Sequence, residues 1–269
     1  MISIVLATLG NRIDEIKRLL DSLEKQTNND FEVIIVSQDN HDLVENIIKE
    51  YKINYKHKKL NKKGLSLARN EGLNYVSGDI ITFSDDDCWY PYDSFERIKN
   101  IFEKSKSSVC CFNIYDPLSN QYYKNYKKNN KYSLNDIDIM RISSIEIFIN
   151  TNKVKLNHIK FDERFGLGSR FNSGEENIML VDLIKNKYSI DYHSEIIVYH
   201  EKKQKNNNLD SKVMYSKGAM FKRMYPNLKG ILYANLLAIK NIRSLNEKLS
   251  CLYSINKGFK EFEKFDMKN

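Results

Sequence analysis

Residues Asp79–Pro91 read DIITFSDDDCWYP, and the predicted fold is organised around this segment. Its first half is β-branched and aromatic, which is typical of a buried strand. Three consecutive carboxylates, Asp85, Asp86 and Asp87, follow at once, and Pro91 ends the extended segment. Adjacent negative charges repel one another, so a divalent cation that also holds an anionic ligand would explain them. A solvated acidic turn before the next helix would explain them equally well.

Upstream of this segment, strand and helix patterns alternate. Strands are predicted at residues 2–7, 31–36, 53–55 and 79–84, and helices at 13–26, 44–48 and 64–76. This alternation predicts an open, mostly parallel α/β sheet, in which ligands bind at the carboxyl ends of the strands. Polar residues stand at three of those ends: Thr8, Gln38 with Asp39, and Asp85 with Asp86 and Asp87. Together they predict one binding site.

Downstream, the periodicity continues with further elements. Strands are predicted at 108–115, 145–149 and 196–199, and helices at 95–102, 178–184, 211–224 and 228–240. Residues 119–133 are basic and rich in tyrosine, and they predict a loop that contacts an acceptor or one that is uninvolved.

Two further positions carry groups suited to chemistry. Glu175 and Glu176 precede the helix at 178–184, where the helix dipole stabilises negative charge. Neighbouring carboxylates also raise each other's proton affinity, which suits a general base. His200 ends the strand at 196–199 and is either structural or a ligand.

The composition is that of a globular protein, with 269 residues, 41% hydrophobic and 29% charged. Such a chain forms one large α/β domain or one domain with an appendage. The four cysteines form no CxxC pair, which predicts free thiols in a reducing cytoplasm. We see no secretory signal, and no segment approaches the roughly 20 apolar residues that span a bilayer.

The positive charge is concentrated at the C-terminal end. Of 43 basic and 35 acidic residues, 15 and 6 lie in residues 201–269, which leaves net charges of −1 for residues 1–200 and +9 for the remainder. Such a segment attracts an anionic membrane surface or nucleic acid, although a solvated helical face is the alternative. Because no recognition motif accompanies the charge, we expect no nucleic-acid partner.

The segment Ala7–Asn11, which follows the first predicted strand, is not a glycine-rich phosphate loop. A dinucleotide-binding domain would show G-x-G-x-x-G there, and no Walker sequence occurs either. The sequence therefore predicts that a metal and arginine hold any phosphates. A sugar nucleotidyltransferase, which would need a glycine- and arginine-rich loop, is a weaker alternative.

Taken together, these residues resemble the family 2 glycosyltransferases, which are inverting enzymes with the GT-A (nucleotide-diphospho-sugar transferase) fold. The resemblance covers about residues 1–200. It rests on Thr8, EVIIVSQDN (32–40), GLSLARNEG (64–72), DIITFSDDDCWYP (79–91), FDERFGLGSRFNSGEE (161–176) and Val198–His200. It implies a catalytic domain at 1–200, with a nucleotide-sugar half at 1–104 and an acceptor half at 105–200, and a basic helical extension at 201–269.

The resemblance also implies a donor site. Thr8, Gln38 and Asp39 would line the pocket of the nucleotide base, and Arg69 would contact the base or diphosphate. Ser37-Gln38-Asp39 replaces the commoner Asp-Asp-Gly turn, so the side chain that reads the base is open.

The family's Asp-x-Asp motif can be placed here in two registers, on residues 84–86 or 85–87. We favour Asp85 on the ribose and Asp86 on Mn²⁺ or Mg²⁺, with Asp87 as a second metal ligand. His200 would complete the metal shell.

For the chemistry, the second glutamate of the Glu175–Glu176 pair is expected to be the base. The implied reaction moves a hexose or N-acetylhexosamine from a nucleotide donor, expected to be a UDP-sugar, to a saccharide acceptor. Capsule, O-antigen or another surface polysaccharide would be the product. The basic C-terminal helices suggest a lipid-linked acceptor and a cytoplasmic protein peripheral to the inner face of the membrane. Packing of these helices against the main domain is the alternative. A non-catalytic nucleotide- or glycan-binding relative is the alternative, and a homodimer is left open.

Overall fold

The computed structural model describes residues 1–202, 211–240 and 245–266 and divides the chain into two compact units. The first unit comprises Met1–Lys63, Leu67–Lys160 and Leu183–Lys203. The second comprises Gly64–Ser66, Phe161–Asp182 and Gln204–Asn269. Each unit is described by itself.

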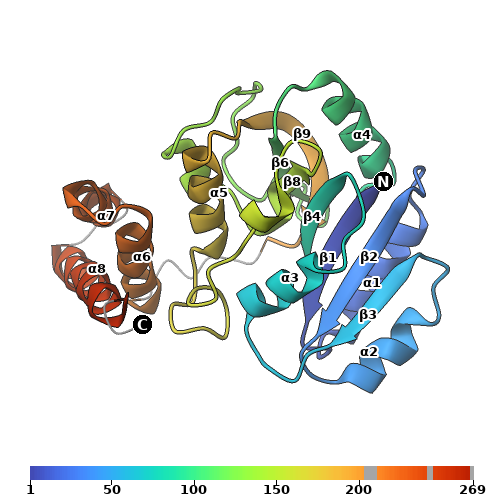
Figure 1. The fold of residues 1–269 in the computed structure, drawn as a ribbon, viewed down its shortest axis with the longest axis horizontal. Coiled ribbons are helices and arrows are strands. Elements are labelled where there is room, and N and C mark those ends of the chain that lie inside the picture. The colour runs from blue at the N-terminus through green and yellow to red at the C-terminus, as the bar shows by residue number, and fades with distance from the viewer. Residues whose placement is uncertain (203–210, 241–244, 267–269) are drawn as a thin grey trace. The chain divides into compact units, whose positions relative to one another are not determined.

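The first unit begins with the predicted alternation of strands and helices. Its elements are β1 (Ile2–Thr8), α1 (Ile13–Glu24), β2 (Phe31–Ser37), α2 (His41–Ile48), β3 (Tyr55–Lys59), α3 (Leu65–Leu73, whose first two residues belong to the second unit) and β4 (Ile80–Asp85). Strand β1 pairs with β2 and β4, and β2 pairs with β3, all in parallel (Figure 1). The prediction of an α/β sheet with parallel strands is therefore confirmed.

Strand β3 lies later in the chain than the predicted 53–55, because it is the edge strand of the sheet. Its sequence YKHKK is only partly buried, and an edge strand needs no continuous apolar run.

The remainder of the sheet mixes strand directions. The remaining elements of the first unit are β5 (Cys88–Trp89), α4 (Ser94–Lys104), β6 (Val109–Asp116), β7 (Gln121–Tyr122), β8 (Ile147–Asn150), α5 (Glu175–Lys185, shared with the second unit) and β9 (Ile190–His200), with 3₁₀ turns at 138–141, 144–146 and 156–158. The strand order is β3-β2-β1-β4-β8-β6-β9-β5, and β7 pairs with β6. Strand β8 is antiparallel to β4 and β6, whereas β9 is parallel to β6.

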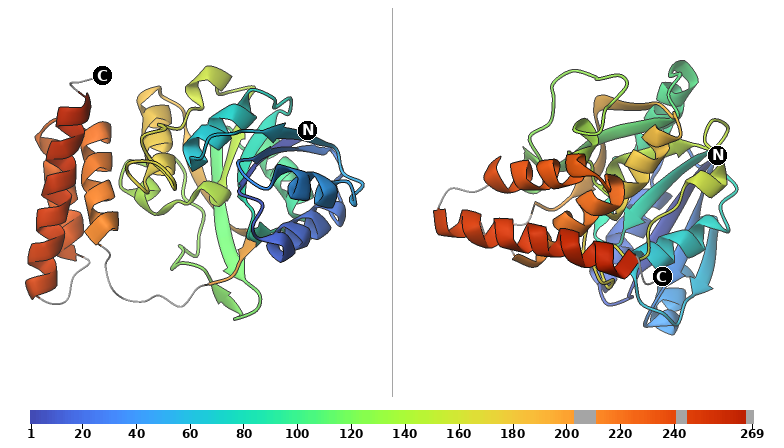
Figure 2. Two further views of the ribbon diagram at one scale, coloured as in Figure 1. Left: turned by 90° about the horizontal axis from the view of Figure 1, so that it is seen from below. Right: turned by 60° about the vertical axis from the view of Figure 1, so that its left-hand side comes forward.

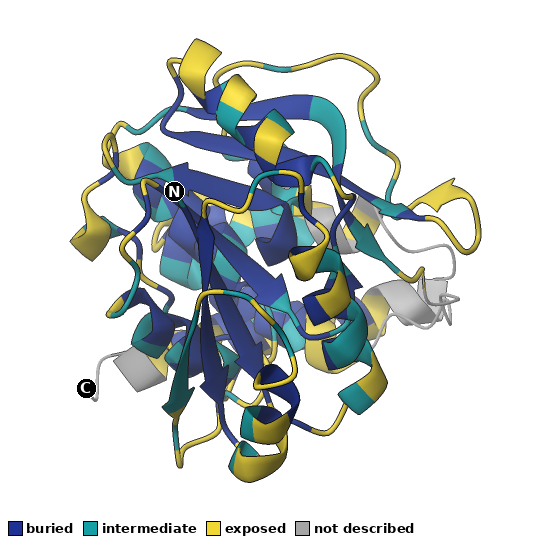
Figure 3. Ribbon diagram, turned by 90° about the vertical axis from the view of Figure 1, so that its right-hand side faces the viewer, coloured by how far each residue is buried: buried dark blue, intermediate teal, exposed yellow. Residues whose placement is uncertain are grey.

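Helices cover both faces of the parallel strands. One face carries Ile2, Ile4 and Leu6, which belong to the same buried cluster as the apolar residues of α1, α2 and α4. On the other face α3 approaches closely, since a Cβ atom at Gly72 would lie 2.5 Å from Val5 Cγ1. Figure 3 shows buried strands between helices whose outer turns are exposed. The carboxyl ends of β1, β2 and β4 are thereby held at one edge.

The second unit contains three packed helices, α6 (Ser211–Met224), α7 (Leu228–Lys240) and α8 (Leu245–Asp266) (Figure 2). The predicted helices at 211–224 and 228–240 are confirmed. Helix α8 was not predicted, although its buried side chains Cys251, Ile255, Phe259 and Phe262 follow a helical spacing.

Residues 161–182 pack against these helices. Phe165 and Phe171 stack on each other at 5.0 Å between ring centroids, and the Phe262 ring lies within 5.7 Å of both. Gly174 has a φ of +103°, and a Cβ atom there would lie 2.7 Å from Met220 Sδ. Ion pairs also join this segment to α6, because Arg223 contacts Asp162 at 2.9 Å and Asp182 at 2.8 Å.

We predict that Arg223→Met destabilises the second unit by roughly 2–3 kcal/mol, because Asp162 and Asp182 would lose their shared cation. Arg170→Met is the matched control, since Arg170 is half exposed and lies 3.8 Å from Glu261. Urea unfolding followed by circular dichroism measures both variants, and equal effects would contradict the prediction.

The destabilisation should also depend on pH. Burial raises the pKa of Asp162, but the hydrogen bonds and charges of Arg164 and Arg223 outweigh it, so the pKa is lowered overall. A lowered carboxyl pKa stabilises the fold above the pKa of the unfolded chain and ceases to do so as the pH falls through the folded value. The difference between the wild type and Arg223→Met should therefore shrink in acid.

Candidate functional site

The three consecutive aspartates stand where the chain reverses after β4. Asp85 ends β4, Asp86 and Asp87 form the turn, and β5 begins at Cys88. Strand β5 pairs antiparallel with the end of β9, which places Cys88 opposite His200. The sheet thus brings a histidine from far along the chain to the acidic turn.

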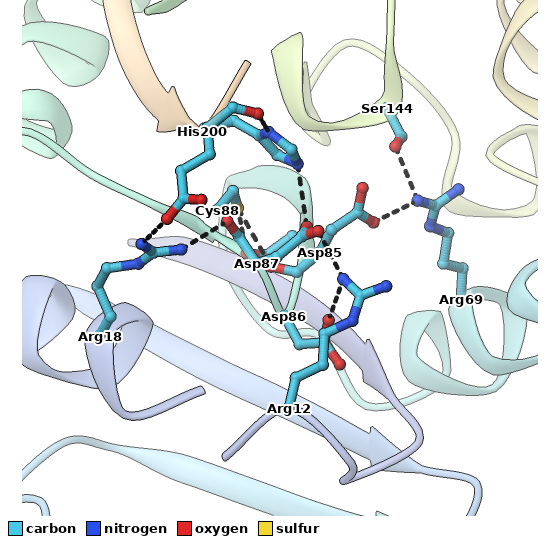
Figure 4. A network of polar contacts seen from close by, with 11 residues as sticks. Arg12, Arg18, Arg69, Asp85, Asp86, Asp87, Cys88, Ser144 and His200 are labelled. Atoms are coloured by element: carbon cyan, nitrogen blue, oxygen red, sulfur yellow. Dashed lines mark hydrogen bonds and ion pairs between the residues drawn. The ribbon is translucent and has the colours of Figure 1, made fainter. Parts of the chain in front are cut away.

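Asp87 and His200 form a direct contact in this turn. His200 Nε2 lies 3.1 Å from Asp87 Oδ1, and Nδ1 lies 2.7 Å from the carbonyl oxygen of Glu201 (Figure 4). Because a carbonyl only accepts, Nδ1 carries a proton and Nε2 is the atom presented to Asp87. Burial lowers the pKa of His200, but the hydrogen bond and charge of Asp87 outweigh it, so the pKa is raised.

Asp86 points to the end of β1. The Thr8 hydroxyl donates to Asp86 Oδ2 at 2.7 Å, and Arg12 Nη1 lies 3.3 Å from Oδ1. The backbone amide of Gly10 donates to Thr8 Oγ1, which fixes the hydroxyl. Burial raises the pKa of Asp86, while Thr8 and Arg12 oppose the rise. Arg12 also lies 2.5 Å from Asp87, so one guanidinium serves two carboxylates.

Asp85 is held from α3. The Arg69 side chain is 1% exposed, and its guanidinium donates to Asp85 Oδ1 at 2.9 Å and to Ser144 Oγ at 2.7 Å. The Asp85 side chain is 36% exposed. Buried Arg69 therefore orients a carboxylate that faces solvent.

Sequence reasoning did not identify Arg12 or Arg18 as site residues. Arg18 donates to the backbone oxygen of Asp87 at 3.3 Å, pairs with Glu201, and lies 3.9 Å above the Trp89 ring. Arg12 could have been found from its place just after the polar turn that follows β1. Nothing in the helical spacing of α1 distinguishes Arg18.

The predicted base-binding residues lie at the adjoining strand end. Thr8 stands opposite Ser37 in the ladder of β1 and β2, and Gln38 and Asp39 follow directly. Gln38 is buried and donates to the carbonyl oxygen of Lys62 at 2.6 Å. Asp39 is exposed and contacts Lys63 at 2.7 Å, which lowers the pKa of Asp39. The Thr8 hydroxyl is directed to Asp86 rather than to this turn.

Glu175 and Glu176 open α5 in the second unit. Glu175 is buried, whereas Glu176 is half-buried. Gly174, in its positive-φ conformation, accepts the first helical hydrogen bond from Ile178. Of the pair, Glu176 is the more accessible to a substrate.

A permanent metal cage is absent from the described residues, since no group of three or more His, Cys, Asp or Glu there is placed to hold an ion. Asp87 and His200 nevertheless supply two ligands within contact distance. Mg²⁺ is commonly held by one or two carboxylates together with substrate phosphates. The donor set therefore fits a cation that is bound jointly by the protein and a phosphate ligand.

Comparisons with known proteins show what the chain is similar to in sequence and in fold. The model of the family described as Glycosyl transferase family 2 matches residues 3–225. Glycosyltransferase GlyA of Streptococcus pneumoniae is 30% identical over 115 residues, which are 41% of this chain and 16% of GlyA. The minor teichoic acid biosynthesis protein GgaB of Bacillus subtilis is 30% identical over 171 residues, 59% of this chain and 18% of GgaB. The chain thus spans less than a fifth of the length of either relative.

Among solved structures, S. aureus TarS 1–349 is similar in fold. Its complex with UDP-GlcNAc has a TM-score of 0.65 at 18% identity, covering 96% of this chain and 72% of TarS 1–349. Its complex with UDP has a TM-score of 0.65 at 15% identity, with coverages of 100% and 92%. The predicted GT-A fold is confirmed by this likeness.

We predict that Asp87→Asn lowers the pKa of His200, because the charge of Asp87 is what raises it above its ordinary value. Titration of the histidine ring signals by NMR measures the change. Asp39→Asn is the control, since Asp39 contacts Lys63 and should leave His200 unaltered. An unchanged His200 pKa in Asp87→Asn would mean that the contact has no electrostatic weight.

Proposed function

This chain belongs to glycosyl transferase family 2, and we propose that it transfers a sugar from a nucleotide-diphosphate donor to a saccharide acceptor. The contact of Asp87 with His200, beside Asp85 and Asp86 at the carboxyl edge of the sheet, carries the proposal. A UDP-sugar is the proposed donor, because the similar TarS fold has been crystallised with UDP-GlcNAc.

In the donor site, Asp85 would accept hydrogen bonds from the ribose hydroxyls, since its carboxylate is exposed and held by Arg69. Thr8, Gln38 and Asp39 would border the base. We assign Arg69 a positioning role in place of direct donor contact, because the side chain is almost completely buried. Arg12 is 42% exposed and would meet the diphosphate.

Bound Mn²⁺ or Mg²⁺ would neutralise the negative charge that develops on the departing diphosphate. Asp87 Oδ1 and His200 Nε2 are the atoms that would hold it, and the Glu201 carbonyl keeps His200 in the required tautomer. The sequence favoured Asp86 as the principal ligand. Since Asp86 accepts from the Thr8 hydroxyl whereas Asp87 contacts His200, we propose Asp87 for that role.

Glu176 is the proposed general base. The pKa of a sugar hydroxyl is far too high for ionisation at neutral pH, so a carboxylate must take its proton during attack. Glu176 is accessible, whereas Glu175 is buried. A base and a leaving group on opposite faces of the sugar give a single displacement with inversion, and no enzyme nucleophile is needed.

The proposed product is a cell-surface polysaccharide. Support comes from GgaB, which is described as a minor teichoic acid biosynthesis protein. A non-catalytic relative would keep the fold and the donor contacts but would show no turnover, so the decisive measurement is transfer itself.

We predict that Glu176→Gln binds UDP like the wild type but loses roughly 10²–10⁴-fold in transfer rate, because only the base is removed. In contrast, Asp87→Asn and His200→Gln should weaken Mn²⁺-dependent UDP binding by about tenfold or more. Calorimetry with UDP and Mn²⁺ measures binding, and UDP release from a panel of UDP-sugars measures transfer.

Glu163→Gln is the matched control for Glu176→Gln, since Glu163 is an exposed glutamate of the same unit. Equal rates in the wild type, Glu176→Gln and Glu163→Gln would contradict the catalytic proposal. Identical UDP binding with and without Mn²⁺ would contradict the metal assignment.

We also propose that α7 contacts an anionic membrane, which would suit a lipid-linked acceptor. Four large aliphatic side chains point outward at spacings of four, four and three residues, which is one face of a helix: Leu228, Leu232, Leu236 and Ile239, exposed by 84%, 57%, 52% and 54%. Lys229 lies beside this stripe, and residues 201–269 carry the surplus positive charge. None of the described helices is long and apolar enough to cross a bilayer. An interfacial position fits both features.

We predict that Leu232→Glu/Leu236→Glu abolishes sedimentation with phosphatidylglycerol vesicles, because it adds two negative charges to the apolar stripe. Phosphatidylcholine vesicles should bind neither protein. Leu43→Glu/Leu118→Glu is the control, since these leucines are 45% and 72% exposed on the first unit. Undiminished vesicle binding would contradict the proposal, and a change in oligomeric state without vesicle binding would assign the stripe to a second copy.

A further inference from the structure

A groove of about 600 Å³ opens on the first unit, away from the acidic turn. The end of α4, the start of β9 and residues near 130–132 line it. His193 lines the groove seven residues before His200 on β9, which at the rise of a strand is about 20 Å. The groove is therefore separate from the site described above, although both involve the same strand.

The most unusual group in this groove is the imidazole of His193. The residue is 7% exposed, and its buried Nε2 has no hydrogen-bond partner within residues 1–202 or the other described segments. Its ring stacks on Phe112 at 5.7 Å and meets the edge of Tyr132 at 6.3 Å. Burial lowers the pKa of His193 against the opposing charges of Asp191 and Glu195, which favours the neutral ring. A buried ring nitrogen without a hydrogen-bond partner is energetically unfavourable. A ligand in the groove could supply the missing hydrogen bond to His193 Nε2.

A distortion of β9 accompanies this placement. Cys111 and Asn113 of β6 pair with Tyr192 and Ile196, so four residue steps on β9 face two on β6. Bulges of this kind redirect side chains and are common beside binding sites. Here the irregular segment contains His193.

The rim of the groove offers positive charge. Lys104 and Lys106, at the end of α4, are exposed, and neither forms an ion pair with any described residue. The two carboxylates of the groove are already engaged. Asp191 accepts from the backbone amide of Ser133 at 2.8 Å, and Glu195 lies 3.5 Å from Arg97. The unpaired charges that face a ligand are therefore cationic.

Neutral polar and aromatic groups complete the lining. Tyr132 is 64% exposed, and its ring offers a flat apolar surface in the groove. Asn130 uses its side-chain oxygen to accept from the Ser194 amide at 2.8 Å, so its amide hydrogens are directed elsewhere. An aromatic surface with a few convergent polar groups is the usual composition of a small-ligand site.

We propose that this groove binds an anionic saccharide or polyol chain. Its phosphate or carboxylate groups contact Lys104 and Lys106, one ring or carbon chain packs on Tyr132, and a hydroxyl group bonds to His193 Nε2. The preference for an anion follows from the lysines, whereas the choice of a carbohydrate rests on the proposed function. The groove would hold an extended acceptor at a point remote from the reaction.

The test uses the full chain without any nucleotide, in about 0.15 M salt, which screens non-specific attraction to the net charge of +8. The probes are a hexamer of glycerol phosphate, hexagalacturonate and neutral maltohexaose. We expect the two anionic probes to shift the NMR ring signal of His193, which His193→Gln identifies among the five histidines. Lys104→Glu/Lys106→Glu should weaken this binding by about tenfold.

Lys25→Glu/Lys52→Glu makes the same charge change at exposed positions elsewhere and should alter binding less than about twofold. The proposal is overturned if no probe moves the His193 signal, which would leave water as its partner, or if both lysine variants weaken binding equally. Equal binding of maltohexaose would overturn the anionic preference. A difference between the phosphate and carboxylate probes identifies the group that is recognised. Because no donor is present, loss of transferase activity would leave this result unaffected.

Discussion

Three adjacent carboxylates repel one another, and the first unit gives each of them its own positive or donor partner. Asp85 is held by buried Arg69, Asp86 by Thr8 and Arg12, and Asp87 by Arg12 and His200. These partners come from α3, from the end of β1 and the turn after it, and from the end of β9, so the cluster exists only when the whole sheet is assembled. The pairing of β5 with β9 is the step that closes it. The fold itself therefore orients the three carboxylates, which is what stabilisation of a developing charge requires.

The local residue pattern was sufficient to predict the elements that bury a continuous apolar face. Strands β1, β2 and β4 consist mainly of apolar or β-branched residues, and helices α1 and α6 repeat apolar residues at helical spacing. The pattern failed where pairing with distant residues determines the outcome. The polar edge strand β3, the irregular β9 and the arginines that meet the acidic turn depend on partners far along the chain. The preference of Asp87 over Asp86 for His200 is likewise set by the turn geometry, which no spacing rule encodes.

The division into units also reflects packing that the sequence did not show. Residues 161–176 resemble part of the catalytic domain, yet Phe165 and Phe171 pack on Phe262, and Arg223 joins Asp162 to Asp182. The proposed base Glu176 therefore stands at the start of α5, in the unit that the C-terminal helices stabilise. Those helices are part of the framework of the proposed reaction as well as an extension of the chain.

This framework bears on two interpretations of the basic C-terminal segment, packing against the main domain or lying on a membrane. Both interpretations can hold for different faces of the same helix, because the faces differ in the size and exposure of their side chains. Helix α7 turns Gly230 and buried Ala234 inward, and a Cβ atom at Gly230 would lie 2.1 Å from the carbonyl oxygen of Tyr225. Leu228, Leu232, Leu236 and Ile239 face outward instead, the reverse of a helix that serves only a protein core. Small residues permit the close packing of α7 on the other helices of the second unit, and the outward aliphatic residues supply the surface that we assign to lipid.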